Sequence, residues 1–302
     1  MDRVAARFAV HQKGLLIRSQ AHEAGLSDEA IDHRIETGRW GRMHAGVYRV
    51  AGTQPGFEQG LLAACFAAGP EAVASHRGAG AVWGFDAVEQ AIELTVPRPL
   101  NPRVRGAMIH RVTALPREDI TVHSDTPITT VARTVIDLAG IFRPPRLEVV
   151  YDDALVKRLT TTRELQERLD ALGRCGRRGV ATIAALLDEP ANWSRARSRT
   201  ERRFLRLLRA HGLPLPIPNY EIRLPNGETA FLDAAYPDLL LAIEASSFRW
   251  HATRRDWARN ETRNSRLGAM GWRFIYVVPE DIDRQPPVVV DLVRQGLAHL
   301  SV

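Results

Sequence analysis

The last third of the chain contains the residues whose types and spacing best fit a catalytic site. They are three acidic residues, Glu201, Asp233 and Glu244. They fall on a predicted helix and on two of the strands expected to follow it. Carboxylates that converge can hold a hard divalent cation such as Mg²⁺, or Mn²⁺ in its place, and neighbouring arginines can bind phosphate. If these acids converge, this region is suited to act on nucleic acid.

A strongly basic segment leads into the acids and continues along the predicted helix. A run of like charges usually marks a solvated face rather than a binding site. Here the run borders the predicted acidic site, so we expect three of its members to bind phosphate: Arg199, Arg202 and Arg206.

Glu201 has a second interpretation as a helix cap. Ser198 precedes it by three residues, and Ser-x-x-Glu is the pattern of a capping box, in which Glu201 reaches back to the backbone amide of Ser198. One carboxylate cannot fully serve both a cap and a cation. The helix by itself favours the cap, whereas the two later acids favour the cation.

Residues 196–302 show the order helix, three strands, helix, strand and helix, which is typical of a small α/β core with a mixed sheet. Pro225-Asn226-Gly227 predicts a hairpin turn, and Gly271 predicts the end of a long helix. The predicted strands cover residues 220–224, 228–235, 239–243 and 272–278, and the long helix covers residues 256–270.

The pairing of two of these strands decides whether Asp233 and Glu244 meet. A four-residue turn would pair Asp233 with Ala242 and would place Glu244 diagonally on the same face, roughly 7 Å away. A three-residue turn would place Glu244 on the opposite face. The sequence leaves this register open, and the predicted metal site depends on it.

Residues 1–52 predict a winged helix-turn-helix, in which Ser19 and Ser27 cap the second and third helices and residues 40–48 form the wing. A protein-interaction module is the alternative, because the third helix carries four acids that would repel phosphate. The exposed candidates for DNA contact are His33, Arg34, Arg39 and Arg42.

Residues 53–190 mix strands and helices and predict a middle α+β domain. Strands are expected at residues 91–96 and 106–112, and helices at residues 130–141, 155–172 and 177–187. His76, His110 and His123 are scattered through this part, and no chemistry is assigned to them. The polar residues 188–198 are typical of a linker.

Composition fits a protein of the cytoplasm that meets nucleic acid. The 302 residues carry a net charge of +6, supplied mostly by arginine, which suits planar partners such as phosphate. Cys65 and Cys175 lack metal-ligand spacing, which argues against a zinc site or a disulfide framework. No apolar run is long enough to span a membrane.

The C-terminal third resembles an endonuclease-like domain related to the very-short-patch repair endonucleases and to the wider PD-(D/E)XK nuclease fold. The resemblance implies a Mg²⁺ or Mn²⁺ ion held by Asp233 and Glu244, with Glu201 as a further ligand. It also implies that His251 handles water and that Arg263 contacts the scissile phosphate or a carboxylate. The matching residues are Glu201, Asp233, Ile243-Glu244, Phe248-Arg249-Trp250-His251, Trp257, Arg263, Leu267 and Gly271-Trp272.

Residues 1–190 resemble an AbiEi-type antitoxin. The residues that show this resemblance are 11–52 and 129–138. This likeness implies DNA as a partner, together with a cognate toxin or a second copy of the chain. The three parts together predict a multidomain α/β (α+β) protein: a winged helix-turn-helix in residues 1–52, an α+β domain in residues 53–190, and a restriction-endonuclease-like mixed sheet flanked by helices in residues 196–302.

Two departures from the nuclease pattern leave the activity open. Ser246 stands where the family usually has an acid and the wider fold has a lysine, and Asn260 stands where the family usually has aspartate. Losing anions weakens cation binding. The chain is therefore expected to be either a DNA-binding Mg²⁺-dependent endonuclease or a non-catalytic, antitoxin-like regulator whose nuclease fold is degenerate.

Overall fold

The structure is a computed structural model that describes residues 7–173, 178–190, 193, 195–245 and 254–298. The chain divides into two compact units. The first unit comprises Met1–Ala154 and Arg158–Leu187, and the second comprises Leu155–Lys157 and Asp188–Val302. Each unit has its own hydrophobic core.

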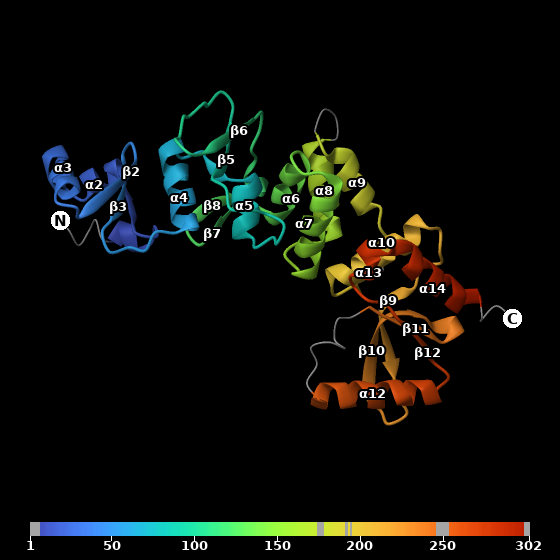
Figure 1. Cartoon of the computed structure of the whole chain (residues 1–302). Helices are drawn as coiled ribbons and strands as arrows, with labels where there is room; N and C mark the ends of the chain where they lie inside the picture. Colours follow the sequence, from blue (N-terminus) through green and yellow to red (C-terminus); the bar gives the residue numbers. More distant parts are fainter. Residues whose placement is uncertain (1–6, 174–177, 191–192, 194, 246–253, 299–302) are drawn as a thin grey trace. The chain divides into compact units, whose positions relative to one another are not determined.

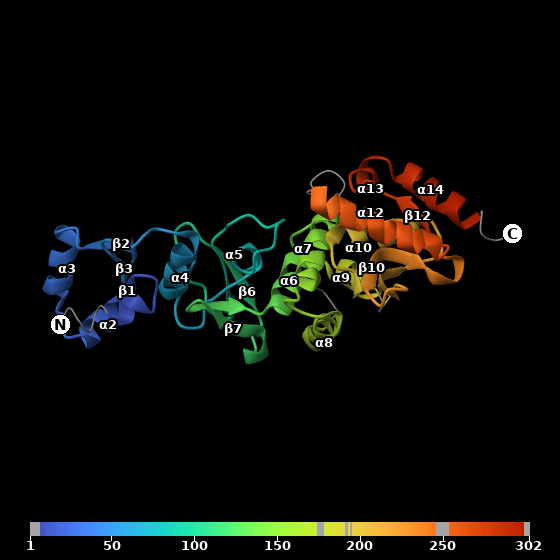
Figure 2. The same cartoon turned by 90° about the horizontal axis from the view of Figure 1, so that it is seen from below.

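The first unit begins with a three-stranded sheet in the order β1-β3-β2. Figures 1 and 2 show two helices, α2 and α3, beside this sheet. Leu16, Ile31, Trp40 and Tyr48 pack together between sheet and helices. The elements are β1 (Leu15–Ile17), α2 (Arg18–Glu23), α3 (Asp28–Glu36), β2 (Trp40–His44) and β3 (Val47–Val50).

Ser27 caps α3 as expected, because its side chain accepts the backbone N–H of Ala30. The expected cap at Ser19 is wrong, since α2 already begins at Arg18. There the side chain of Gln20 accepts the backbone N–H of Ile17. The strand β1 was not expected from the sequence.

The rest of the first unit contains a five-stranded mixed sheet in the order β6-β5-β4-β8-β7. Its core lies between this sheet and α4, where Leu61, Ala74, Leu94 and Ile128 pack together. The elements are α4 (Phe57–Ala68), β4 (Val73–Ala74), α5 (His76–Val82), β5 (Glu93–Pro97), β6 (Met108–Val112), η1 (Arg117–Asp119), β7 (Ile120–His123) and β8 (Thr126–Thr129).

Four helices complete the first unit, and three of them correspond to expected ones. The expected helix at residues 155–172 is too long, because Arg158 has a φ of +55° and Thr161 starts a new helix with a capping box closed by Glu164. The helices are α6 (Val131–Ala139), α7 (Pro144–Val156), α8 (Thr162–Leu172) and α9 (Val180–Leu187).

The second unit is built on a four-stranded sheet in the order β12-β11-β10-β9, and it is mixed because β11 and β12 run parallel. In Figure 1, α12 lies on one side of this sheet, and α10, α13 and α14 lie on the other. The elements are α10 (Arg199–Ala210), β9 (Ile217–Arg223), β10 (Thr229–Tyr236), η3 (Pro237–Leu239), β11 (Leu241–Glu244), α12 (Arg254–Ala269), β12 (Arg273–Tyr276), α13 (Asp281–Arg284) and α14 (Pro286–Ala298).

The connection between β10 and β11 sets the register of the acids. Tyr236 pairs with Leu241 and Ala234 pairs with Ile243, so the loop is four residues long, and Leu240 takes a φ of +47° within it. Of the two turns that the sequence left open, the four-residue one is present, but Asp233 does not pair with Ala242, because the loop begins one residue later than that alternative assumed. Continuing the observed register by one residue places Asp233 opposite Glu244.

The segment expected to be a linker is packed where the structure describes it. Trp193 is only 1% exposed and lies against Leu205 and Leu215. The protein is thus a mixed α/β chain whose described strands form three sheets. Among the described helices, none combines the length and the apolar character that crossing a membrane requires.

Candidate functional site

Two strands and a helix bring the three acids of the second unit together. Asp233 lies in β10, Glu244 ends β11, and Glu201 lies in the first turn of α10. The backbone N–H of Ala245 donates to Asp233 Oδ2 over 2.9 Å, which fixes this carboxylate at the end of β11. The expected convergence of the acids is therefore present in the fold.

The electrostatics of the site confirm that the carboxylates affect one another. Burial, together with the nearby Asp233 carboxylate and more weakly Glu201, raises the pKa of Glu244 to about 7. Burial also raises the pKa of Asp233. The pKa of Glu201 is raised by burial and by the Asp233 carboxylate. The site would gain from a cation, because buried like charges repel each other.

Arg263 of α12 supplies part of this positive charge. Its Nη2 lies 3.1 Å from Glu244 Oε1, and its Nη1 donates to the carbonyl of Phe231 over 3.1 Å. Both contacts hold the guanidinium next to the acids, where it lowers the pKa of Glu244 and of Asp233. Of the two contacts expected for Arg263, the structure contains the one with a carboxylate.

Glu201 takes part in the start of α10, but it does not form the expected capping box, because its carboxylate bonds the amide of Arg197 rather than that of Ser198. The backbone N–H of Glu201 donates to Ser198 Oγ, which in turn donates to Glu201 Oε1 over 2.8 Å. The other oxygen, Oε2, accepts the backbone N–H of Arg197 over 2.8 Å. Because both oxygens are engaged, Glu201 suits an outer position around a cation better than direct ligation.

Asp233 and Glu244 fit a hard divalent cation. Both are oxygen donors, both are largely buried, and one or two carboxylates with water suffice for Mg²⁺. The three acids are not gathered as tightly as a preformed cage. Within the described residues, the one group of three such ligands whose donor atoms all lie within 4.8 Å of one another is in the first unit: His76, Glu93 and His110.

Three residues of the expected site cannot be placed. His251 and Ser246 lie outside the described residues, as does the side chain of Asn260. The described site therefore consists of Glu201, Asp233, Glu244 and Arg263, and it contains no assigned group for handling water.

The three arginines expected to bind phosphate differ in position. Arg202 is 1% exposed, and it pairs with Glu189 and donates to the carbonyl of Trp193. Arg206 donates to the other oxygen of Glu189 over 2.5 Å. The expectation for Arg202 and Arg206 is corrected: they hold the segment before α10 in place. Arg199, half-buried on the first turn of α10, keeps its expected role as a hypothesis.

The expected DNA-contacting residues of the first unit also divide into two groups. Arg34 lies over the Trp40 ring, 5.7 Å from its centroid, and donates to the carbonyl of Ala30, so it contributes to packing. Three residues are exposed: His33, Arg39 and Arg42.

The acidic residues of α3 should repel DNA phosphate less strongly than the sequence indicated, because basic side chains lie next to them. Asp28 lies 3.0 Å from His22 Nε2 and 3.5 Å from Arg18 Nη2. Asp32 lies 3.9 Å from Arg42 Nη2. Neighbouring basic groups therefore offset part of the negative charge on this helix.

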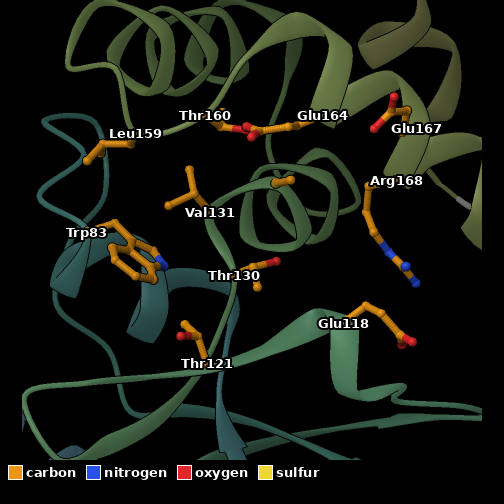
Figure 3. Close-up of a pocket in the computed structure, with 11 residues that line it drawn as sticks. Trp83, Glu118, Thr121, Thr130, Val131, Leu159, Thr160, Glu164, Glu167 and Arg168 are labelled. Atoms are coloured by element: carbon orange, nitrogen blue, oxygen red, sulfur yellow. The ribbon is translucent and has the colours of Figure 1, made fainter.

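A cavity of 460 Å³ lies in the first unit and is lined by none of the expected site residues. Figure 3 shows Trp83 and Arg168 on opposite sides of it, with Glu164 and Glu118 at its edges. Its polar groups are largely engaged within the protein: Thr160 donates to Glu164, and Arg168 pairs with the buried Asp119. The cavity therefore identifies no ligand.

Comparison with known proteins places the chain in a family. No family model matches it. Two relatives from Mycobacterium tuberculosis, "Uncharacterized protein MT2308" of strain CDC 1551 / Oshkosh and "Uncharacterized protein Rv2248" of strain ATCC 25618 / H37Rv, are each 30% identical to it over 266 residues. The alignments cover 86% of this chain and 93% of each relative. The chain therefore belongs to the same family as these two mycobacterial proteins.

Proposed function

We propose that the protein binds DNA and that its second unit is an endonuclease-like domain of the PD-(D/E)XK type with Mg²⁺-dependent activity on the phosphodiester backbone. The observation that carries this proposal is the convergence of Asp233, within β10, and Glu244, at the end of the paired strand β11, with Arg263 beside them. Carboxylates of this kind hold a cation, and an arginine holds phosphate.

The chain's own residues have distinct roles in this proposal. Asp233 and Glu244 would hold the cation, and Glu201 would keep Arg197 and Ser198 in place at the start of α10. Arg263 would move from Glu244 to a phosphate oxygen when DNA binds. A divalent cation bound at this site would polarise the phosphate and activate a water molecule.

The first unit supports DNA binding by a second route. Its first sheet and helices follow the order α2, α3, β2, β3 behind the short strand β1, as in a winged helix-turn-helix. In that arrangement α3 would enter the major groove, and the turn between β2 and β3 would contact the backbone. His33, Arg39 and Arg42 would be the contacting residues.

A non-catalytic, antitoxin-like regulator is the second candidate. Two observations favour it: Arg263 already compensates the charge of Glu244, and Glu201 is used by the helix cap. A domain of this kind would bind DNA, a cognate toxin or a second copy of the chain without cutting DNA.

The test compares cleavage of plasmid and oligonucleotide DNA in Mg²⁺ or Mn²⁺ by the wild type, Asp233→Asn and Glu244→Gln. Asp238→Asn is the matched control, because Asp238 is an exposed aspartate in the loop between β10 and β11. An active endonuclease is expected to lose cleavage in the first two variants and keep it in the control. Salt-sensitive DNA binding without cleavage by the wild type would favour the regulator.

A further inference from the structure

Three potential metal ligands meet on the five-stranded sheet of the first unit. His76 begins α5, Glu93 begins β5, and His110 lies in β6. Thr95, two residues after Glu93, pairs with His110 in the parallel register of β5 and β6. Glu93 and His110 therefore lie close together on one face of the sheet, and His76 is brought against them from the start of α5.

The ring of His76 is oriented by hydroxyl groups. Its Nδ1 lies 3.0 Å from Ser75 Oγ, which accepts a hydrogen bond from Thr95 Oγ1 over 2.7 Å. This contact leaves Nε2 of His76 as the nitrogen available to a ligand. The backbone of His76 has a φ of +49°, a strained conformation for a residue other than glycine, and such strain is concentrated at functional sites.

Glu93 is oriented in the same way by Arg77. Oε1 of Glu93 accepts hydrogen bonds from Nε and Nη2 of Arg77, at 2.7 Å and 2.5 Å. Oε2 accepts the backbone N–H of Arg77 over 3.0 Å and faces His110. One oxygen therefore positions the carboxylate, and the other remains able to bind a cation.

The Nε2 atom of His110 has no hydrogen-bond partner, although it is buried. Glu93 Oε2 lies 3.6 Å from this nitrogen, which is ion-pair distance for a protonated His110 but longer than a hydrogen bond. A buried polar atom without a partner is costly and requires an explanation. A ligand held between His110, Glu93 and His76 would provide one.

We propose that His76, Glu93 and His110 form a binding site for a divalent transition metal ion of the zinc class, separate from the acidic site and independent of the proposed cleavage of DNA. Two imidazoles and one carboxylate suit Zn²⁺ and its neighbours rather than Mg²⁺. Ser75 behind His76 and Arg77 behind Glu93 match the outer partners that usually orient metal ligands.

Metal binding requires one change in this arrangement. The rings of His76 and His110 are stacked, with their centroids 3.5 Å apart and 13° between their planes. The lone pair of each nitrogen lies in the plane of its ring, so stacked rings cannot direct both lone pairs at one point. The ring of His110 is the one expected to turn, because its side chain is 21% exposed.

The experiment titrates the chelator-treated full-length chain with Zn²⁺ by calorimetry, and with Co²⁺ by absorption as a probe of coordination. One ion per chain is expected at the site. Removing an outer partner of a metal ligand typically lowers metal affinity about 10- to 100-fold. Ser75, whose Oγ contacts Nδ1 of His76, is such a partner, so Ser75→Ala should lower Zn²⁺ affinity by roughly that factor. His110→Ala and Glu93→Gln should lower it more.

His123→Ala is the matched control, because His123 lies in the same unit beside Trp83 and outside the cluster. Thermal unfolding in chelator establishes whether each variant is folded, and Ser75→Ala provides a readout of the site if the ligand variants are not folded. Absence of Zn²⁺ binding by the wild type, or wild-type affinity in the folded His110→Ala and Glu93→Gln variants, would overturn the proposal.

Discussion

The guanidinium of Arg263 lies 3.1 Å from the carboxylate of Glu244, at a place where burial and the neighbouring Asp233 raise the pKa of that carboxylate to about 7. Arg263 lowers the pKa of Glu244 and of Asp233, yet the pKa of both carboxyl groups stays raised because both are buried. This imbalance gives the acidic site measurable consequences for stability, whether or not the protein cleaves DNA.

Glu244 is expected to make the free energy of unfolding decrease as the pH rises through neutrality when divalent cations are absent. Its pKa is raised from 4.5 to about 7 in the folded chain, so between these values the folded state binds more protons than the unfolded state. The stabilisation is complete below pH 4.5 and is lost as the pH rises through 7. It amounts to roughly 3 kcal/mol.

Urea unfolding in chelator at several pH values, for the wild type and Glu244→Gln, checks this expectation. Glutamine cannot ionise, so the variant should lose less stability than the wild type between pH 5 and pH 8, roughly the range that the raised pKa defines. The same pH dependence in both proteins would show that Glu244 does not carry a raised pKa.

Replacing Arg263 with methionine should destabilise the second unit by about 3 kcal/mol at pH 8, because removing one partner leaves the other buried acid uncompensated. The loss should be smaller when Glu244→Gln is introduced as well, since the two side chains are coupled. Chemical unfolding of the single and double variants measures this coupling.

Arg266 provides the control for that measurement. It lies on the same helix and pairs with Glu228, and both side chains are substantially exposed. Arg266→Met should therefore change stability by less than about 1 kcal/mol. Equal losses for Arg263→Met and Arg266→Met would contradict the special position of Arg263.

Arg202 is expected to act on stability rather than on DNA. It is buried against Glu189 and Trp193, so Arg202→Met should cost about 3 kcal/mol by leaving Glu189 without one of its two arginines. The exposed Arg209, which pairs with Asp188, provides the matched control. Arg209→Met should lower the free energy of unfolding by less than about 1 kcal/mol. A loss of DNA affinity with unchanged stability would reverse the assignment.

The sequence was sufficient to predict most elements of the second unit, because its turns and apolar runs are local signals. Pro225-Asn226-Gly227 forms the expected turn, with Gly227 at a φ of +83°, and Gly271 follows α12 at a φ of +88°. The register of Asp233 was not predictable, because it depends on where the loop after β10 begins. Leu240 has a positive φ in this loop, which is unusual for leucine, so the sequence did not indicate where the loop begins.

Long-range packing explains the remaining failures. The apolar period of α10 gives no indication that Arg202 is buried, because Trp193 and Glu189 cover it from outside the helix. The His76 cluster was missed because its members come from three elements that only the sheet brings together. One signal was present: Glu93 is the one charged residue of β5.

DNA binding by the first unit is expected to depend on Arg39 and Arg42, which are exposed at β2 and just before it. Each phosphate contact contributes about one to the dependence of log affinity on log salt concentration. The double variant Arg39→Ala/Arg42→Ala should therefore bind DNA more weakly at low salt and lower this slope by about two. Fluorescence anisotropy with a labelled duplex at several salt concentrations measures both quantities.

The control must remove the same charge elsewhere, because a drop in net charge alone weakens association with DNA. Arg103→Ala/Arg105→Ala meets this requirement, since both arginines are exposed on the loop between β5 and β6. This control variant should keep the wild-type dependence of log affinity on log salt concentration and most of the affinity for DNA. If the two double variants behave alike, the first three-stranded sheet and its helices do not form the DNA-binding surface, and the protein-interaction alternative for residues 1–52 gains support.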